Sequence, residues 1–136
     1  MSRRVARETA LQVLFQIDFT GEIDSLEKVI EHWAKEFAVS EKNKKFTTEL
    51  VEGTLHHKQD IDEKISSTAH EWSLERLNTV DRNLMRLAIF EMLYYPDTPQ
   101  RVTLNEAIEI AKKFGSEESG KFINGILDKF MDSDEK

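Results

Sequence analysis

Three arginines stand at the start of the chain. Arg3, Arg4 and Arg7 occur among residues 1–7 with no acidic residue between them. On a helix they fall within about 100° of arc. The first turn of a helix is the unfavourable end for cations, because the helix dipole and the α-amino group are both positive there. Local stability does not explain these arginines, whereas phosphate binding does. A solvent-exposed terminus without a ligand is the alternative.

A second polar group lies near the other end of the chain. Phe114, Lys121, Phe122 and Asn124 place apolar rings beside a cation and an amide. Single-stranded RNA is bound by this mixture, in which rings stack on bases and cations neutralise phosphates. The spacing of Phe114 and Phe122 also fits a helix face that packs into a core. Both interpretations stay open at this point.

No pattern in the chain indicates catalysis. His56 and Asp60 are four residues apart and could share a helix face, but a zinc site needs three or four converging ligands. There is no cysteine, no G-x-S-x-G sequence and no glycine-rich phosphate loop. We therefore expect a protein that is not an enzyme and holds neither a metal nor a cofactor.

Charge and hydropathy bound the class of protein. The 136 residues carry a formal net charge of −7, which argues against a surface that binds nucleic acid everywhere. The sign alternates, however: residues 20–41 are acidic and residues 42–58 are lysine-rich. Such a molecule could present one face to phosphate and another to a basic partner. With no apolar run near the roughly 20 residues of a membrane span and no signal sequence, we expect a soluble, cytoplasmic protein.

Helical periodicity runs through nearly the whole chain. Residues 3–19 predict a helix ending before Gly21, and Asp24 with Glu27 forms a capping box for the next one. Ser40 can cap a long third helix with a bend near Gly53 or Lys58. A short helical turn is expected at residues 73–77.

Residues 80–95 are apolar nearly all round, which predicts a buried central helix capped by Thr79. Thr103 with Glu106 forms a third capping box, Gly115 can adopt a left-handed conformation, and Ser116 can cap a last helix. The predicted fold class is all-α, with six to seven helices in a single domain over residues 1–131 and a flexible acidic tail at 132–136.

Several charged residues fall on the apolar helix. Arg82 and Arg86 must reach solvent, a ligand or an acid, and an acid from a neighbouring helix is the expected partner. Glu91 needs a partner too, and we expect a structural hydrogen bond for it.

Four ordered blocks resemble the NusB family: RRVARETALQVLFQIDF, LVEGTLHHKQDIDEKI, VDRNLMRLAIFEMLYYPDTP and VTLNEAIEIAKKFGSEESGKFINGILDK. The resemblance implies two small helical bundles packed as one domain. It also implies a bacterial antitermination factor that binds boxA, a single-stranded element of ribosomal RNA leader transcripts. The implied partners are NusE, a ribosomal protein, and the RNA polymerase antitermination complex.

The resemblance also implies roles for individual residues. The RNA-binding positions would be Arg3, Arg4, Arg7, Phe114, Glu118, Lys121, Phe122 and Asn124, with Gln12 and Gln16 as weaker candidates. Asp81 would contact NusE. As an anion, Glu118 cannot bind phosphate and would accept from a base amino group or a ribose hydroxyl, or orient Lys121. Some relatives carry a longer or more lysine-rich N-terminal arm, so phosphate contacts upstream of Arg3 are not implied here.

Two other functions fit the same residues. NusB-like domains also precede ribosomal RNA methyltransferases, so an accessory domain is one alternative, although residues 1–136 contain no cofactor-binding βαβ unit. A helical protein-interaction module that binds no RNA is the other. The protein could be a monomer or a homodimer, since some family members pair through the RNA-facing surface.

Overall fold

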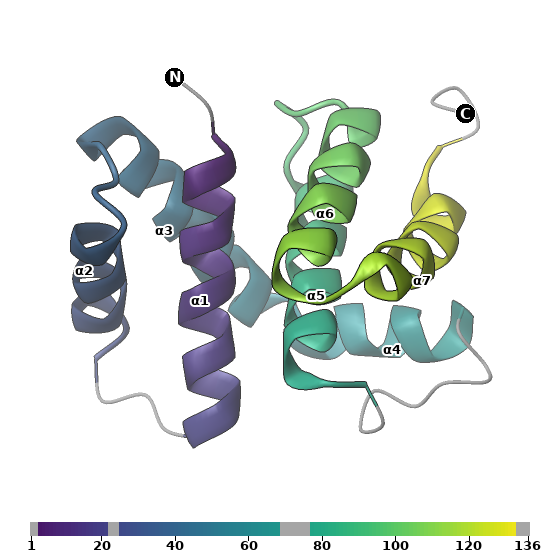
Figure 1. The fold of residues 1–136 in the computed structure, drawn as a ribbon, viewed down its shortest axis with the longest axis horizontal. Helices are drawn as coiled ribbons and strands as arrows, with labels where there is room; N and C mark the ends of the chain where they lie inside the picture. Colours follow the sequence, from purple (N-terminus) through teal and green to yellow (C-terminus); the bar gives the residue numbers. More distant parts are fainter. Residues whose placement is uncertain (1–2, 22–24, 69–76, 133–136) are drawn as a thin grey trace.

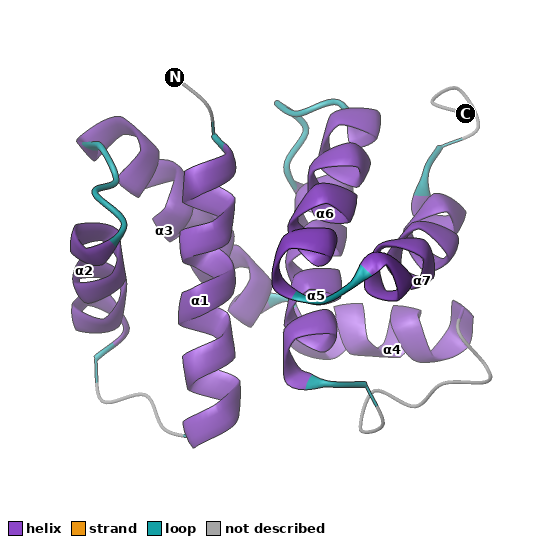
Figure 2. Cartoon of the chain, viewed as in Figure 1, coloured by secondary structure: helices purple, strands orange, loops and turns teal. Residues whose placement is uncertain are grey.

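The computed structural model describes residues 3–21, 25–68 and 77–132. All regular structure in these ranges is helical, and they contain no strand (Figure 2). The helices are α1 (Arg4–Thr20), α2 (Leu26–Glu36), α3 (Glu41–His56), α4 (Lys58–Thr68), α5 (Thr79–Tyr94), α6 (Gln100–Phe114) and α7 (Glu117–Leu127), followed by a 3₁₀ turn, η2 (Asp128–Phe130). The prediction of an all-α fold with six to seven helices is confirmed.

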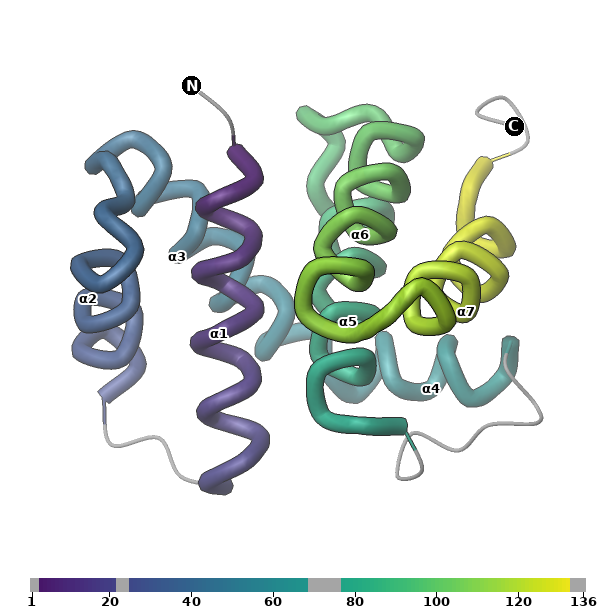
Figure 3. The backbone as a smooth tube through the Cα atoms, in the orientation of Figure 1, coloured from purple at the N-terminus to yellow at the C-terminus, as the bar shows by residue number. Residues whose placement is uncertain are grey.

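The helices form two small bundles (Figure 1). In the first, α1 packs against α2 and α3; in the second, α5 packs against α4, α6 and α7. The bundles are joined because α1 and α3 also pack against α5. The tube in Figure 3 shows α1 and α6 running in the same direction. Long charged side chains connect the two helices, because Arg4 of α1 reaches Glu106 of α6 and Lys113 of α6 reaches Glu8 of α1.

The central position of α5 follows from its sequence. Its buried apolar side chains include Leu84, Met85, Leu87 and Ile89, each at most 2% exposed. Burying a side chain of this size stabilises a fold by about 1.5–3 kcal/mol. The predicted pairing of its two arginines with acids from other helices is confirmed: Arg82 Nε donates to Asp18 of α1 at 2.9 Å, and Arg86 Nε donates to Asp62 of α4 at 2.7 Å.

Helix ends agree with the sequence at some positions and differ at others. Ser40 and Ser116 accept the backbone N–H groups of Asn43 and Ser119, as predicted. Gly21, at φ 73°, ends α1 in the left-handed conformation. The predicted cap at Thr79 is wrong, because Asn78 accepts the Asp81 N–H instead.

Three further boundary predictions need correction. The N-cap of α2 is Ser25, while Asp24 lies outside the described residues. Thr103 does not begin a helix, because α6 already starts at Gln100, after Pro99. Gly115 has φ −122° and is not left-handed. Its lack of a side chain matters for another reason: a Cβ there would lie 2.6 Å from Ser119 Oγ.

The predicted bend in the long third helix is a break at His57, which separates α3 from α4. Gly53 allows α3 to approach α5, since a Cβ on it would lie 2.0 Å from Phe90 Cζ. The turn predicted at 73–77 falls outside the described residues except for Leu77. Of the predicted acidic tail, only Asp132 is described, and its backbone N–H donates to Gln100 Oε1 at 2.7 Å.

Candidate nucleic-acid interface

Ion pairs line the contact between α1 and α6. Arg4 Nε and Nη2 donate to the two carboxylate oxygens of Glu106 at 3.0 and 2.6 Å. One to two turns further along both helices, Lys113 Nζ donates to Glu8 at 3.1 and 3.2 Å. We call this line of four residues, Arg4, Glu8, Glu106 and Lys113, the charged seam. It crosses from the first bundle to the second.

The ion pair between Arg4 and Glu106, which we call the outer pair, shifts the pKa values of both groups. The hydrogen bond from Arg4, opposed by burial and aided by the charges of Arg4 and Arg7, lowers the pKa of Glu106. The same hydrogen bond raises the pKa of Arg4. Both groups are therefore held in their charged forms.

Arg7 points inward from the seam. Its Nε and Nη2 donate to the two oxygens of Glu91 at 2.8 and 2.6 Å, and its side chain is only 7% exposed. The structural hydrogen bond expected for Glu91 is confirmed, with Arg7 as its partner. Arg7 thus lies behind Arg4, and its guanidinium joins the two bundles.

Arg3 sits at the outer end of α1, as the residue before its first turn. Its guanidinium carbon lies 4.1 Å from the centre of the buried Phe46 ring of α3, and that of Arg7 lies 5.3 Å from the same ring. Cations over an aromatic face are attracted to its electron density. The ring therefore holds the Arg3 side chain in place on the surface.

Phe114 lies at the other end of the seam and is 44% exposed. It lines a small cavity of about 90 Å³ with Leu11, Gln12 and Phe15 of α1, together with Glu8, Phe37 and Val80. Lys113 Nζ lies 5.4 Å from the Phe114 ring centre. The charged seam thus begins at Arg4 and ends at Lys113, beside the exposed Phe114 ring.

The remaining predicted RNA-binding residues belong to α7, which packs beside α6. Glu118, Lys121 and Asn124 are exposed, whereas Phe122 is partly buried and packs against the core. The two phenylalanines that the sequence left undecided therefore differ: Phe114 is at the surface and Phe122 is mostly a packing residue.

Asp81, predicted to contact a protein partner, is only 6% exposed. Its Oδ2 accepts from Ser119 Oγ of α7 at 3.3 Å and from Asn78 at 3.2 Å, while Oδ1 is buried without a partner among the described residues. Burial raises the pKa of Asp81, and the hydrogen bonds from Ser119 and Asn78 oppose the shift. The carboxylate connects α5 to the start of α7.

The two weaker candidates on α1 also differ. Gln12 lines the cavity beside Phe114. Gln16 instead accepts a hydrogen bond from the indole N–H of Trp33 at 2.7 Å. Of the two, Gln12 is the one placed along the same surface as the charged seam.

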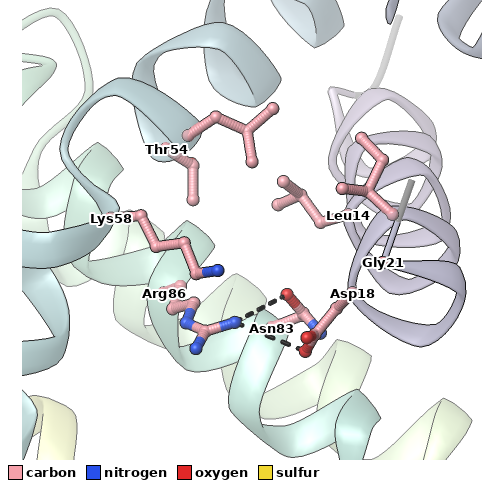
Figure 4. Close-up of a pocket in the computed structure, with 9 residues that line it drawn as sticks. Leu14, Asp18, Gly21, Thr54, Lys58, Asn83 and Arg86 are labelled. Carbon is pink, nitrogen blue, oxygen red and sulfur yellow. Dashed lines mark hydrogen bonds and ion pairs between the residues drawn. The ribbon is translucent and has the colours of Figure 1, made fainter. Parts of the chain in front are cut away.

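A larger cavity of about 250 Å³ lies on the other side of α1 (Figure 4). Its polar wall comprises Asp18, Asn83 and Arg86, and Figure 4 shows the Lys58 side chain directed into it. Arg86 Nη1 donates to Asp18 and to Asn83, both at 3.4 Å, and Asn83 Nδ2 donates to Asp18 at 2.8 Å. These groups largely satisfy one another, so the wall serves chiefly to hold α1, α4 and α5 together.

The described residues contain no group of three or more His, Asp or Glu side chains placed to hold a metal ion. His57 stacks on Tyr94 with ring centres 3.9 Å apart, and Asp60 accepts from the Tyr94 hydroxyl.

No helix in the described ranges is both long enough and apolar enough to cross a bilayer.

Sequence reasoning missed the acids that accompany the arginines. The sequence pattern places Glu106 in a helix cap, and it does not pair Glu8 with Lys113. A signal was present for Glu106: once the helix is extended back to Pro99, Glu106 lies in its second turn and is available for tertiary contacts.

The fold and the seam define a small all-helical protein whose two bundles meet along a charged, partly aromatic surface. The chain belongs to the NusB family, whose model matches residues 4–132. Transcription antitermination protein NusB of Desulfitobacterium hafniense is 62% identical over 133 residues, covering 98% of this chain and 90% of that protein. The Bacillus cereus protein of the same name is 45% identical, covering 98% and 99%.

Solved structures agree. The T. maritima NusB structure superposes with a TM-score of 0.86 at 42% identity, covering 95% of this chain and 89% of that one. A chain in the crystal structure of antitermination factors NusB and NusE in complex with dsRNA gives a TM-score of 0.84 at 27% identity, covering 93% of each. These matches confirm the resemblance found in the sequence.

Proposed function

We propose that this protein is a non-enzymatic antitermination factor that binds boxA RNA together with NusE and acts on RNA polymerase in the cytoplasm. Membership of the NusB family supports the proposal, as does the similar chain in the solved structure of antitermination factors NusB and NusE in complex with dsRNA. The observation that carries it is the surface that runs from Arg3 and Arg4 to Phe114.

Each part of that surface suits a different part of single-stranded RNA. Arg3 and Arg4 offer guanidinium groups to phosphates, and Lys121 extends this positive potential onto α7. Phe114 offers an exposed ring on which a base can stack. Glu118 and Asn124 can hydrogen-bond base edges or ribose hydroxyls. Arg7 and Phe122 contribute by positioning their neighbours, because Arg7 is buried and Phe122 is partly buried against the core.

NusE binding is assigned to the region around Asp81. Because Asp81 is 6% exposed, we expect it to act by fixing the start of α5 against Ser119 of α7, so that the adjoining surface keeps its shape. A direct contact with a basic NusE side chain would require the buried Oδ1 to become accessible, since Oδ2 already accepts from Ser119.

A fluorescence anisotropy titration tests the function. The probes are labelled boxA RNA, a scrambled single strand and a duplex of the boxA sequence, each with and without NusE and at two salt concentrations. We expect preference for boxA, tighter binding with NusE, and a log–log salt slope of about 0.7 per phosphate neutralised. Binding of NusE with no RNA binding under any condition would instead identify a protein-interaction module.

Sedimentation velocity on the same samples measures the oligomeric state. If a homodimer uses the RNA-facing surface, addition of boxA RNA will dissociate it. A dimer that persists with RNA bound must use another surface.

A further inference from the structure

Glu106 occupies one hydrogen-bonding edge of the Arg4 guanidinium. It comes from α6, whereas the arginines come from α1, and its two oxygens take the Nε and Nη2 hydrogens of Arg4 at 3.0 and 2.6 Å. Its Oε1 also lies 3.6 Å from Nη1 of Arg7. One carboxylate thus faces two of the three arginines.

A carboxylate and a phosphate present the same kind of ligand to arginine. Both offer two oxygens that accept in parallel from the planar guanidinium fork. Because Glu106 accepts from one such edge of Arg4, it stands in the free protein where a phosphate would bind by the same geometry.

Stability gives little reason for an acid at this position. The inner pair, Arg7 with Glu91, has side chains 7% and 1% exposed and joins the bundles. The outer pair has side chains 41% and 20% exposed, and exposed ion pairs typically contribute little. The two acids leave the three arginines with a net charge of only +1, which reduces the attraction of the patch for RNA.

We propose that Glu106 is an internal competitor for RNA phosphate at Arg4 and thereby sets the RNA affinity of this surface. The inference rests on the proposed RNA-binding function. RNA gains the Arg4 contact only by displacing Glu106 or sharing the guanidinium with it. A ligand that makes only the phosphate contact gains little binding free energy, because it must first displace Glu106. RNA that also stacks a base on Phe114 gains additional binding free energy from the stacking.

The substitution Glu106→Gln tests the inference, because it removes the charge and keeps one accepting oxygen. We expect boxA affinity to rise about threefold to tenfold at low salt, since one opposing charge near a phosphate is removed. The log–log salt slope should steepen by about 0.7, the value for one additional phosphate contact on a single strand.

Glu109→Gln is the matched control. Glu109 lies one turn further along α6, is exposed and pairs with Lys112 at 3.3 Å. Glu109→Gln removes the same charge but leaves the hydrogen bonds between Arg4 and Glu106 in place. We therefore expect a much smaller change in boxA affinity. In an Arg4→Ala background, Glu106→Gln should have no more effect than Glu109→Gln.

A spectroscopic measurement on the unsubstituted protein covers the case in which Glu106→Gln fails to fold. In ¹⁵N-labelled protein the arginine Nε–H signal of Arg4 should shift when boxA RNA is added, as its acceptor changes. An unmoved Arg4 signal, with α7 backbone signals shifting, overturns the inference. So does Glu106→Gln binding that equals or falls below that of the unsubstituted protein. Absence of RNA binding by the unsubstituted protein contradicts the proposed function instead.

Discussion

The Arg7 guanidinium and the Glu91 carboxylate meet inside the protein through two hydrogen bonds of 2.8 and 2.6 Å. One residue belongs to α1 of the first bundle and the other to α5 of the second. A buried pair of this kind is costly to break, because without Glu91 the buried Arg7 guanidinium keeps only the more distant Glu106, 3.6 Å from its Nη1. The contact makes Arg7 a residue of the core in a cluster that otherwise faces solvent.

Glu91→Gln should therefore lower the free energy of unfolding by about 3–5 kcal/mol. Arg4→Ala, which breaks the more exposed pair with Glu106, should cost less than about 1 kcal/mol. Urea denaturation followed by circular dichroism measures both. Equal and small losses in the two variants would show that the inner pair does not join the bundles.

Lowering the pH should destabilise the folded protein, in part through protonation of Asp18. Burial raises the pKa of Asp18, but hydrogen bonds from Asn83 and Arg82 and the charges of Arg82 and Arg86 outweigh it and lower the pKa overall. A carboxyl with a lowered folded pKa contributes stability above its unfolded pKa, which is about 3.9, and loses it as pH falls through the folded value.

Asp18→Asn should consequently reduce the melting temperature at pH 7 and make the fall in melting temperature below about pH 4 shallower. Glu36→Gln, an exposed position on α2, is the control and should follow the unsubstituted protein. Parallel acid profiles for Asp18→Asn and the unsubstituted protein would contradict the role given to Asp18.

The contribution of Asp81 to stability has the opposite pH dependence to that of Asp18. Burial raises its pKa, so its charged form is disfavoured in the folded state, and its contribution is most favourable below the unfolded pKa and declines as pH rises through the folded one. Asp81→Asn should raise the melting temperature at pH 7 relative to its effect at pH 4. NusE affinity, measured by calorimetry, should change little if Asp81 acts by positioning and fall strongly if it binds NusE directly.

Two glycines should respond oppositely to alanine. Gly53→Ala places a Cβ 2.0 Å from Phe90 Cζ and should destabilise by about 1–3 kcal/mol through overpacking. Gly125→Ala, within α7 and with nothing inside 4 Å of its Cβ, should stabilise by about 0.5–1 kcal/mol. Thermal melts of both variants test the packing of α3 on α5. A stable Gly53→Ala protein would mean that Phe90 can move aside.

The phenylalanines separate binding from packing. Phe114→Ala should weaken boxA binding by about 1–3 kcal/mol, the value of one base stacked on a ring, with little change in melting temperature. Phe122→Ala should instead lower the melting temperature, because Phe122 packs against the core. Anisotropy and thermal melts on the same two preparations give both readouts. Loss of RNA binding confined to Phe122→Ala would reverse the assignment.

The helices could be predicted because their signals are local. Apolar periodicity marks α1 and α5, and Ser40 and Ser116 mark helix starts whose caps form as expected. The end of α1 at Gly21 is local as well. The caps at Thr79 and Thr103 were misplaced because Asn78 and Pro99, which compete for the same role, stand only one and four residues earlier.

The candidate site was only partly predictable. Clustering of Arg3, Arg4 and Arg7 is visible in the sequence, but the burial of Arg7 depends on Glu91, 84 residues away. The sequence positions of Phe114 and Phe122 both fit a helix face that packs into a core. Only the packing of α6 and α7 makes Phe114 exposed and Phe122 partly buried. The ion pair of Glu106, which the sequence places in a capping box, is not predictable because its partner Arg4 lies 102 residues away.

The packing of α1 against α5 also bears on synthesis. During synthesis the side of α1 that faces α5 stays uncovered until residues 79–94 have left the ribosome. At two places on that side the chain carries Arg7 and Asp18, the partners of Glu91 and Arg82. Charged side chains stay hydrated before their partners are available, whereas exposed apolar surface promotes aggregation of nascent chains. We therefore expect Arg7 and Asp18 to reduce aggregation of the unfinished chain before they pair with Glu91 and Arg82.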